Sequence, residues 1–173
     1  TNIDRRYFEK IGINYGDTLE LVIKHNMRNV YNSTVKFVKS FAEVADILKI
    51  IKKDNAGLMM DTHHFNRAND SIELLKTFPS EWFRYAQICD APLAPLERDK
   101  MIEIMRGGRD YLGEGLIDVA SILNAMPIVP YSIELPNSKR VEEYGYEGHA
   151  KKCLETAKKY CDTFVTGLSL IHI

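Results

Sequence analysis

Segments of strand type alternate regularly with segments of helical periodicity along this chain of 173 residues. In chain order we predict a helix at 17–26, a strand at 28–33, a helix at 40–53, a strand at 58–61, a helix at 70–77, a strand at 82–89, a helix at 117–126, a strand at 128–135 and a helix at 142–163. Such alternation is typical of an α/β fold, in which crossover helices join parallel strands. A complete (β/α)8 barrel takes about 250 residues, so the predicted strands correspond to about half of one.

The bulk composition shows no strong charge bias. The chain has 23 basic and 24 acidic residues and a formal net charge of −1, which gives no support for a nucleic-acid partner. No apolar run approaches the roughly 20 residues of a membrane span. Cys89, Cys153 and Cys161 form no CxxC pair, so we expect free thiols in a reducing compartment, the cytoplasm. We expect a single domain over residues 1–173.

Polar side chains occur where three of the predicted strands end. Asp61, Gln87 and Glu134 each lie near the carboxyl end of a strand, and a parallel sheet brings such ends to one face. Two carboxylates and an amide oxygen suit a hard divalent cation such as Mn²⁺ or Mg²⁺. The alternative is that these residues meet water and cap the following helices. We expect the thiol of Cys89 to point to the side of its strand opposite Gln87.

Two histidines and two arginines are further candidates for a binding site. His63 and His64 follow the second predicted strand directly, and a histidine beside a metal can ligate it, carry a proton or donate to a substrate. The alternative is a loop with one exposed and one packed imidazole. Arg67 and Arg109 offer bidentate donors for a carboxylate or phosphate, although surface positions also fit them. Charges and glycines fill residues 93–115, where we predict a long functional loop.

Four motifs together resemble the xylose-isomerase-like barrel superfamily. Asp-Thr-His-His-Phe-Asn-Arg at 61–67 resembles its Asp-x-x-His-x-x-Arg signature, and Gln-Ile-Cys-Asp-Ala-Pro at 87–92 resembles the next strand. The segment 109–115 resembles Arg-x-x-Pro-Gly-Glu-Gly, with Leu112 at the proline position. Ser-Ile-Glu at 132–134 resembles a final strand that ends in a metal-binding glutamate. The motifs agree in order and spacing over most of the chain.

The resemblance implies a TIM barrel of which this chain holds the C-terminal half, with one divalent metal at the carboxyl ends of the strands. Family ligands come from four strands, and Asp61, Gln87 and Glu134 match the last three. The first family ligand is a glutamate, whereas this chain has Tyr31 or Asn32 at that place. Asn32 could offer a neutral oxygen, which should weaken metal binding.

The resemblance also implies roles for individual residues. His64 would contact the substrate and move protons, Glu134 would be both ligand and base, and Arg67 and Arg109 would bind the substrate. The expected activity is metal-dependent isomerisation or epimerisation of a sugar or sugar phosphate through an enediolate. The alternatives are a 3-dehydroshikimate dehydratase-like lyase, which acts on a hydroxy acid, and a truncated or degenerate half barrel without catalysis. A longer natural chain or a second copy in a homo-oligomer would complete the barrel.

Overall fold

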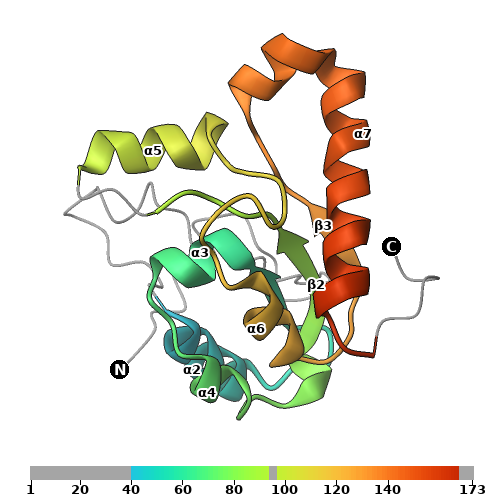
Figure 1. Ribbon diagram of the computed structural model, residues 1–173. Helices are drawn as coiled ribbons and strands as arrows, with labels where there is room; N and C mark the ends of the chain where they lie inside the picture. The colour runs from blue at the N-terminus through green and yellow to red at the C-terminus, as the bar shows by residue number, and fades with distance from the viewer. Residues whose placement is uncertain (1–39, 94–96, 168–173) are drawn as a thin grey trace.

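The computed structural model describes residues 40–93 and 97–167 (Figure 1). The helix predicted at 17–26, the strand predicted at 28–33 and Asn32 lie outside the described residues. In the described ranges, no helix combines the length and the apolar character needed to cross a membrane.

Three parallel strands form the sheet at the centre of the described structure (Figure 1). They are β1 (Leu58–Asp61), β2 (Phe83–Ile88) and β3 (Tyr131–Ile133), in the order β1-β2-β3. Neighbours in the sheet are therefore consecutive along the chain, and each pair is joined by a helical crossover. This is the connection that the alternating sequence pattern predicts.

Helices connect the strands and cover the sheet. They are α2 (Phe41–Ile51), α3 (Thr62–Arg67), α4 (Ile72–Leu75), the 3-10 helix η2 (Ser80–Trp82), α5 (Arg98–Gly107), α6 (Val119–Asn124) and α7 (Ser138–Phe164). Figure 1 shows α7 running alongside β3, with α5 beyond the carboxyl end of β2 and α2 and α4 toward its amino end.

The register of the sheet places the main apolar core on one face and the pair Asp61 and Gln87 on the other. Met60 pairs with Ala86, and both belong to the core that also includes Val44 of α2. Asp61 pairs with Gln87 in the next position of the same register. Because successive residues of a strand point to opposite faces, Asp61 and Gln87 lie together on the face turned away from that core.

The helix predicted at 40–53 is confirmed as α2. Ser40 Oγ accepts a hydrogen bond from the Glu43 N–H at 3.3 Å, which satisfies one free donor of the first turn. Lys52 ends the helix in the left-handed region with a φ of 47°. One face of the helix is buried and consists of Phe41, Val44, Ala45, Ile47 and Leu48.

Two helices occupy segments for which the sequence predicted loops. The helix α3 has six residues, too few to show a helical period, and it forms because Asp61 caps its first turn. The helix α5 buries none of its residues. Its apolar pattern is therefore weak, and its many charges and terminal glycines favoured the prediction of a loop. The prediction of a continuous loop at 93–115 is therefore wrong for residues 98–107.

Other elements differ from the prediction at their ends. The helix predicted at 70–77 is the single turn α4, capped by Ser71. The strand predicted at 128–135 pairs over three residues only. The closing helix begins at Ser138 because Asn137 caps it, and it bends at Gly145, whose φ of 68° is left-handed.

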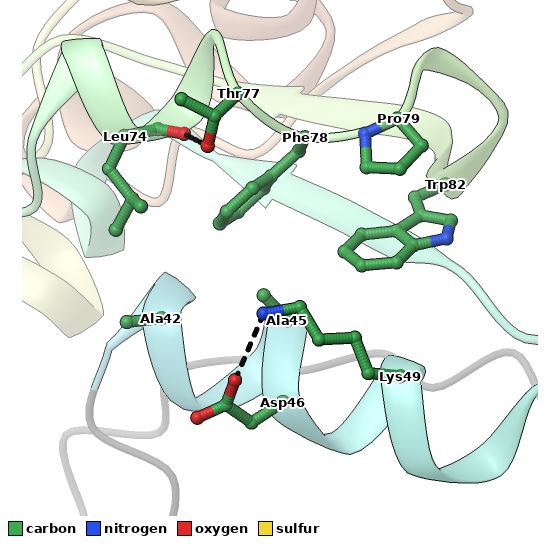
Figure 2. A pocket seen from close by; sticks show the side chains of 9 residues that line it. All are labelled: Ala42, Ala45, Asp46, Lys49, Leu74, Thr77, Phe78, Pro79 and Trp82. Atoms are coloured by element: carbon green, nitrogen blue, oxygen red, sulfur yellow. Dashed lines mark hydrogen bonds and ion pairs between the residues drawn. The ribbon is translucent and has the colours of Figure 1, made fainter.

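A hollow of about 420 Å³ lies between α2 and the segment from α4 to η2 (Figure 2). Its lining is mostly apolar and consists of Ala42, Ala45, Asp46, Lys49, Leu74, Thr77, Phe78, Pro79 and Trp82. Trp82 directly precedes β2, so the hollow lies toward the amino ends of the strands. It is separate from the strand ends that carry Asp61 and Gln87.

Candidate functional site

The sheet brings three polar residues to one face at the carboxyl ends of its strands. Asp61 pairs with Gln87, and Gln87 pairs with Ser132. Glu134 lies two residues beyond Ser132 and therefore continues on the same face. The three strand-end residues that the sequence singled out, Asp61, Gln87 and Glu134, are thus neighbours, while their roles remain predictions.

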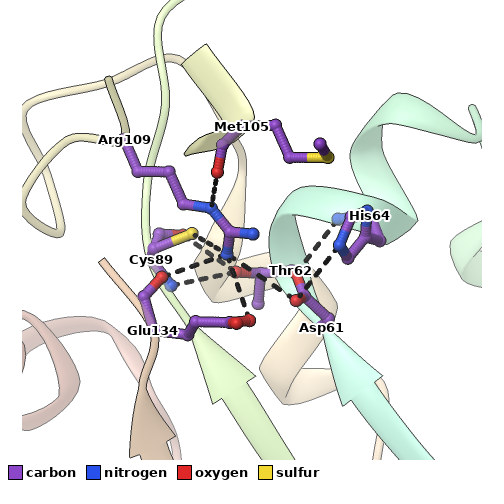
Figure 3. Close-up of polar contacts among 7 residues, drawn as sticks. All are labelled: Asp61, Thr62, His64, Cys89, Met105, Arg109 and Glu134. Atoms are coloured by element: carbon purple, nitrogen blue, oxygen red, sulfur yellow. Dashed lines mark hydrogen bonds and ion pairs between the residues drawn. The ribbon is translucent and has the colours of Figure 1, made fainter. Parts of the chain in front are cut away.

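Arg109 joins the two carboxylates of this face (Figure 3). Its Nη1 lies 3.7 Å from Asp61 Oδ2 and 3.4 Å from Glu134 Oε2. The same nitrogen donates to the main-chain oxygen of Glu134 at 3.0 Å, and Nε donates to that of Met105 at 3.3 Å. Burial lowers the pKa of Arg109, but the surrounding thiol and carboxylates outweigh burial and raise this pKa above its usual value. Arg109 therefore places a permanent positive charge inside the site.

The two carboxylate oxygens of Asp61 have different partners, the backbone of α3 and the guanidinium of Arg109. Its Oδ1 accepts a hydrogen bond from the His64 N–H at 3.1 Å and caps α3. Its Oδ2 faces Arg109 but accepts no hydrogen bond from the described residues. Burial raises the pKa of Asp61 to about 7, against the lowering effect of Arg109. Asp61 is thus a carboxylate held out of water with one oxygen still available to a ligand.

Cys89 lies in the site, contrary to the orientation expected from the sequence. Its Sγ is 3.5 Å from Arg109 Nη1, and residues two apart on a strand point to the same side, so Cys89 shares the face of Gln87. Burial raises the pKa of the Cys89 thiol to about 12, which keeps it neutral. Thr62 fixes its backbone by donating to the Cys89 carbonyl at 2.8 Å and accepting from its N–H at 3.1 Å.

Both histidines that follow β1 are buried in α3, so the expectation of a loop with one exposed imidazole is wrong. The His64 Nε2 lies 3.7 Å from Asp61 Oδ2, which places this ring at the edge of the site. The ring of His63 is fully buried and meets that of His64 edge to face, with centroids 5.4 Å apart. Neither ring nitrogen of His63 has a hydrogen-bond partner among the described residues. Burial lowers the pKa of His63 to about 2, so its imidazole is neutral.

His63→Phe is expected to increase the free energy of unfolding by about 1–2 kcal/mol, because it removes two buried polar atoms that make no hydrogen bond with residues 40–93 or 97–167. Urea unfolding at neutral pH measures the change. The matched control is His149→Phe, which removes a buried imidazole whose two nitrogens are both hydrogen-bonded and should lower stability. A loss of stability in His63→Phe would contradict the prediction and indicate a bound partner for His63.

Arg67 makes its hydrogen bonds at the rim of the site. Its Nη2 donates to the Pro92 carbonyl at 2.7 Å and its Nη1 donates to Asn66 at 2.8 Å. Burial lowers the pKa of Arg67. These bonds tie α3 to the chain that leaves β2, so Arg67 supports the rim of the site, and its predicted contact with a substrate stays a prediction.

Asp90 is a residue of the site region that sequence reasoning did not select. Its Oδ1 accepts hydrogen bonds from the N–H groups of Ala91 at 2.8 Å and Ile117 at 2.9 Å, and its Oδ2 accepts one from Gly113 at 3.1 Å. Its backbone also exchanges two hydrogen bonds with Asp110, the residue after Arg109. Asp90 therefore organises the segment that delivers Arg109. Its place in the Cys-Asp-Ala-Pro sequence at the end of β2 was the available signal.

Gly115→Ala is expected to destabilise the protein by about 1–3 kcal/mol, the usual cost of overpacking. A Cβ at this position would lie 2.5 Å from the Ala91 oxygen and within 2.3 Å of Asp90 Oδ1, so the loop held by Asp90 must shift. Thermal unfolding measures the loss. Glu114→Ala is the neighbouring control, since Glu114 is half exposed and pairs only at the surface with Arg140; an equal loss in both variants would contradict the explanation.

The donor atoms of the site suit a divalent cation bound through oxygen. Asp61 Oδ2 and Gln87 Oε1 are both buried, and neither makes a hydrogen bond with the described residues. Buried oxygens that lack a hydrogen bond are the groups that a hard cation would satisfy, and Asp61 Oδ2 makes ionic contacts at 3.7 Å with Arg109 and His64. The described part of the chain has no group of three His, Cys, Asp or Glu side chains placed to hold a metal, and the ligand role of Gln87 beside Asp61 and Glu134 stays a prediction.

Comparison with curated proteins finds inosose isomerases among the relatives of this chain. It is 27% identical over 122 residues to inosose isomerase of Bacillus subtilis (strain 168), which covers 70% of this chain and 42% of that protein. It is 26% identical over 129 residues to inosose isomerase of Bacillus velezensis, which covers 75% of this chain and 44% of that protein. The chain therefore spans less than half the length of these relatives.

Solved structures share the fold. A structure described as the IolI protein with a binding zinc atom matches with a TM-score of 0.62 at 23% identity, over 75% of this chain and 46% of the other. A xylose isomerase domain protein from Alicyclobacillus acidocaldarius matches with a TM-score of 0.59 at 21% identity, over 77% of this chain and 47% of the other.

The family assignment is independent of these individual relatives. The model of the family described as xylose isomerase-like TIM barrel matches residues 14–159, which is most of the chain. This confirms the resemblance carried by the four sequence motifs, and the three parallel strands are a sector of the barrel. The chain belongs to the xylose isomerase-like TIM barrel family.

Proposed function

We propose that this chain forms the metal- and substrate-binding part of an isomerase that moves a proton next to a carbonyl of inosose or a related sugar. The observation that carries the proposal is the convergence of Asp61, Glu134 and Arg109 at the carboxyl ends of adjacent strands. The inosose isomerases among its relatives favour a cyclic polyol ketone over other substrates.

Asp61, Gln87 and Glu134 would hold the cation, with Mn²⁺ or Mg²⁺ preferred because all three donors are oxygen atoms. When bound, the cation would polarise adjacent substrate oxygens as a Lewis acid. Asn32 lies outside the described residues, and its part as a fourth, neutral donor belongs to the same proposal.

The exposure of the two carboxylates suggests different tasks for them. The Glu134 side chain is 29% exposed, whereas that of Asp61 is 2% exposed. Glu134 is therefore the carboxylate that a substrate can reach, and it would take the proton from the carbon beside the carbonyl and return it to the neighbouring carbon. His64, at the edge of the site, would carry the proton between the two substrate oxygens. Arg109 would stabilise the negative charge that develops on them.

The proposal is tested with Mn²⁺ and with inosose. We expect millimolar MnCl₂ to raise the melting temperature, because a ligand that binds only the folded state stabilises it. In D₂O with Mn²⁺, we expect proton NMR to show deuterium entering inosose at the carbon beside the carbonyl. No thermal shift and no exchange would reject the enzyme and support a half barrel without catalysis. Release of an aromatic product from 3-dehydroshikimate would identify the lyase instead.

A further inference from the structure

A second group of buried polar side chains lies behind the site, between α7 and the segments that carry Arg109 and Glu134. The Tyr111 hydroxyl is 2.8 Å from His149 Nδ1, and His149 Nε2 is 3.0 Å from the Leu135 carbonyl oxygen. Tyr111 is 2% exposed and His149 is 7% exposed. Water is therefore a poor substitute for these bonds, and losing one leaves a buried polar atom unpaired.

The acceptor at one end fixes the direction of both hydrogen bonds. A carbonyl oxygen only accepts, so His149 Nε2 has to carry the hydrogen that is donated to Leu135. In the neutral imidazole, Nδ1 is then an acceptor, and the Tyr111 hydroxyl donates to it. With a neutral imidazole, the hydrogen bonds from Tyr111 through His149 to Leu135 thus have one consistent arrangement of hydrogens.

This chain of bonds joins the two segments at points adjacent to the site. Tyr111 is two residues after Arg109, and Leu135 directly follows Glu134. Two further hydrogen bonds join the same segments. The Arg109 N–H donates to the Pro136 carbonyl at 3.2 Å, and Asn137 Nδ2 donates to the Arg109 carbonyl at 2.8 Å. His149 of the long helix α7 makes hydrogen bonds to both segments.

We propose that His149 is a positioning residue, which acts through Tyr111 and Leu135 to hold Arg109 and Glu134 at the separation that the cation and the substrate require. This inference rests on the proposed function, because it assigns Glu134 to the cation. Arg109 Nη1 is only 3.4 Å from Glu134 Oε2. A small shift of either segment therefore displaces the Glu134 oxygen or brings the guanidinium closer to the cation, and both changes weaken cation binding.

The test compares wild type with His149→Phe, Tyr111→Phe and His149→Gln by two measurements. Isothermal titration calorimetry with MnCl₂, carried out well below the melting temperature, measures the affinity of the site for Mn²⁺. Hydrogen exchange measures the exchange rates of the Arg109 and Glu134 backbone amides. We expect His149→Phe to weaken Mn²⁺ binding by about 10- to 100-fold, the usual effect of removing a residue that orients a ligand. We expect both amides to exchange at least about tenfold faster. His149→Gln, which can still donate to Leu135, should recover part of each loss.

Tyr160→Phe is the matched control, because it removes a tyrosine hydroxyl on the same helix that bonds to Ala120 rather than to the segments of the site. It should leave the Mn²⁺ affinity unchanged. If wild type binds Mn²⁺ and Tyr111→Phe and His149→Phe bind it equally well, the inference is overturned. If wild type binds no Mn²⁺, the proposed function fails, while unchanged amide exchange in the variants separately rejects the positioning role. Should His149→Phe not fold, Tyr111→Phe decides both measurements.

Discussion

Asp61→Asn is expected to weaken Mn²⁺ binding by at least about 100-fold. Removing a residue that only orients a metal ligand already lowers metal affinity by roughly 10- to 100-fold, and Asp61 is proposed to be a ligand itself. The substitution replaces a buried carboxylate by a neutral amide of the same shape. The amide oxygen can still accept from the His64 N–H and cap α3. Arg109 keeps Glu134 as an ionic partner at 3.4 Å, and burial already disfavours the charged form of Asp61 by raising its pKa. We therefore expect the free energy of unfolding to stay within about 1 kcal/mol of wild type. Isothermal titration with MnCl₂ and urea unfolding measure the two quantities separately.

Ser71→Ala provides the control for the capping role of Asp61. Ser71 caps α4 by accepting from the Leu74 N–H at 3.3 Å, and its loss should cost about 1 kcal/mol of stability without any effect on Mn²⁺ affinity. If Asp61→Asn keeps the wild-type affinity, Asp61 is not a ligand. If it unfolds the chain, the separation between capping and binding is wrong.

The parts of the fold that the sequence predicted are those with a strong local signal. The strand β1 has the predicted limits, because a short apolar run is bounded by Gly57 and ends in Asp61. The helix α2 has an apolar period of helical type and Ser40 as a cap, and both features act within a few residues. Parallel pairing then followed from the alternation of elements.

The parts that the sequence did not predict are of two kinds. Some depend on contacts between segments distant in the chain, and others are helices too short to show a helical period of apolar residues. The helix α3 has only six residues and depends on its cap, Asp61. The burial of His63 depends on the packing of α3 against β2, which no local pattern records. The position of Arg109 beside Asp61 depends on Asp90, which anchors a segment far away in the chain. The sequence therefore named Asp61, Glu134 and Arg109 as candidates, but it did not place the Arg109 guanidinium between the two carboxylates.

Arg109→Met is expected to destabilise the protein by about 3–5 kcal/mol, the usual cost of removing one partner from buried ionic groups. Asp61 and Glu134 would face each other without the guanidinium that now lies within 3.7 Å of both. At roughly 2–4 °C per kcal/mol for a chain of this size, the melting temperature should fall by about 6–20 °C. Lysine would not restore the loss, because it cannot reproduce the planar donors that also reach the Met105 and Glu134 carbonyls.

Arg140→Met separates this effect from the loss of any arginine. Arg140 pairs with Glu114 at 2.9 Å and with Glu143 at 3.6 Å, its side chain is 32% exposed, and it lies over the Tyr111 ring at 5.1 Å. The loss of these partly exposed contacts should cost less than about 2 kcal/mol. Saturating MnCl₂ should stabilise Arg109→Met more than wild type, because a divalent cation can replace the missing positive charge between Asp61 and Glu134. Equal stabilisation of both proteins by Mn²⁺ would show that the cation and the guanidinium do not share the same carboxylates. If Arg109→Met is as stable as wild type without metal, Arg109 does not neutralise Asp61 and Glu134.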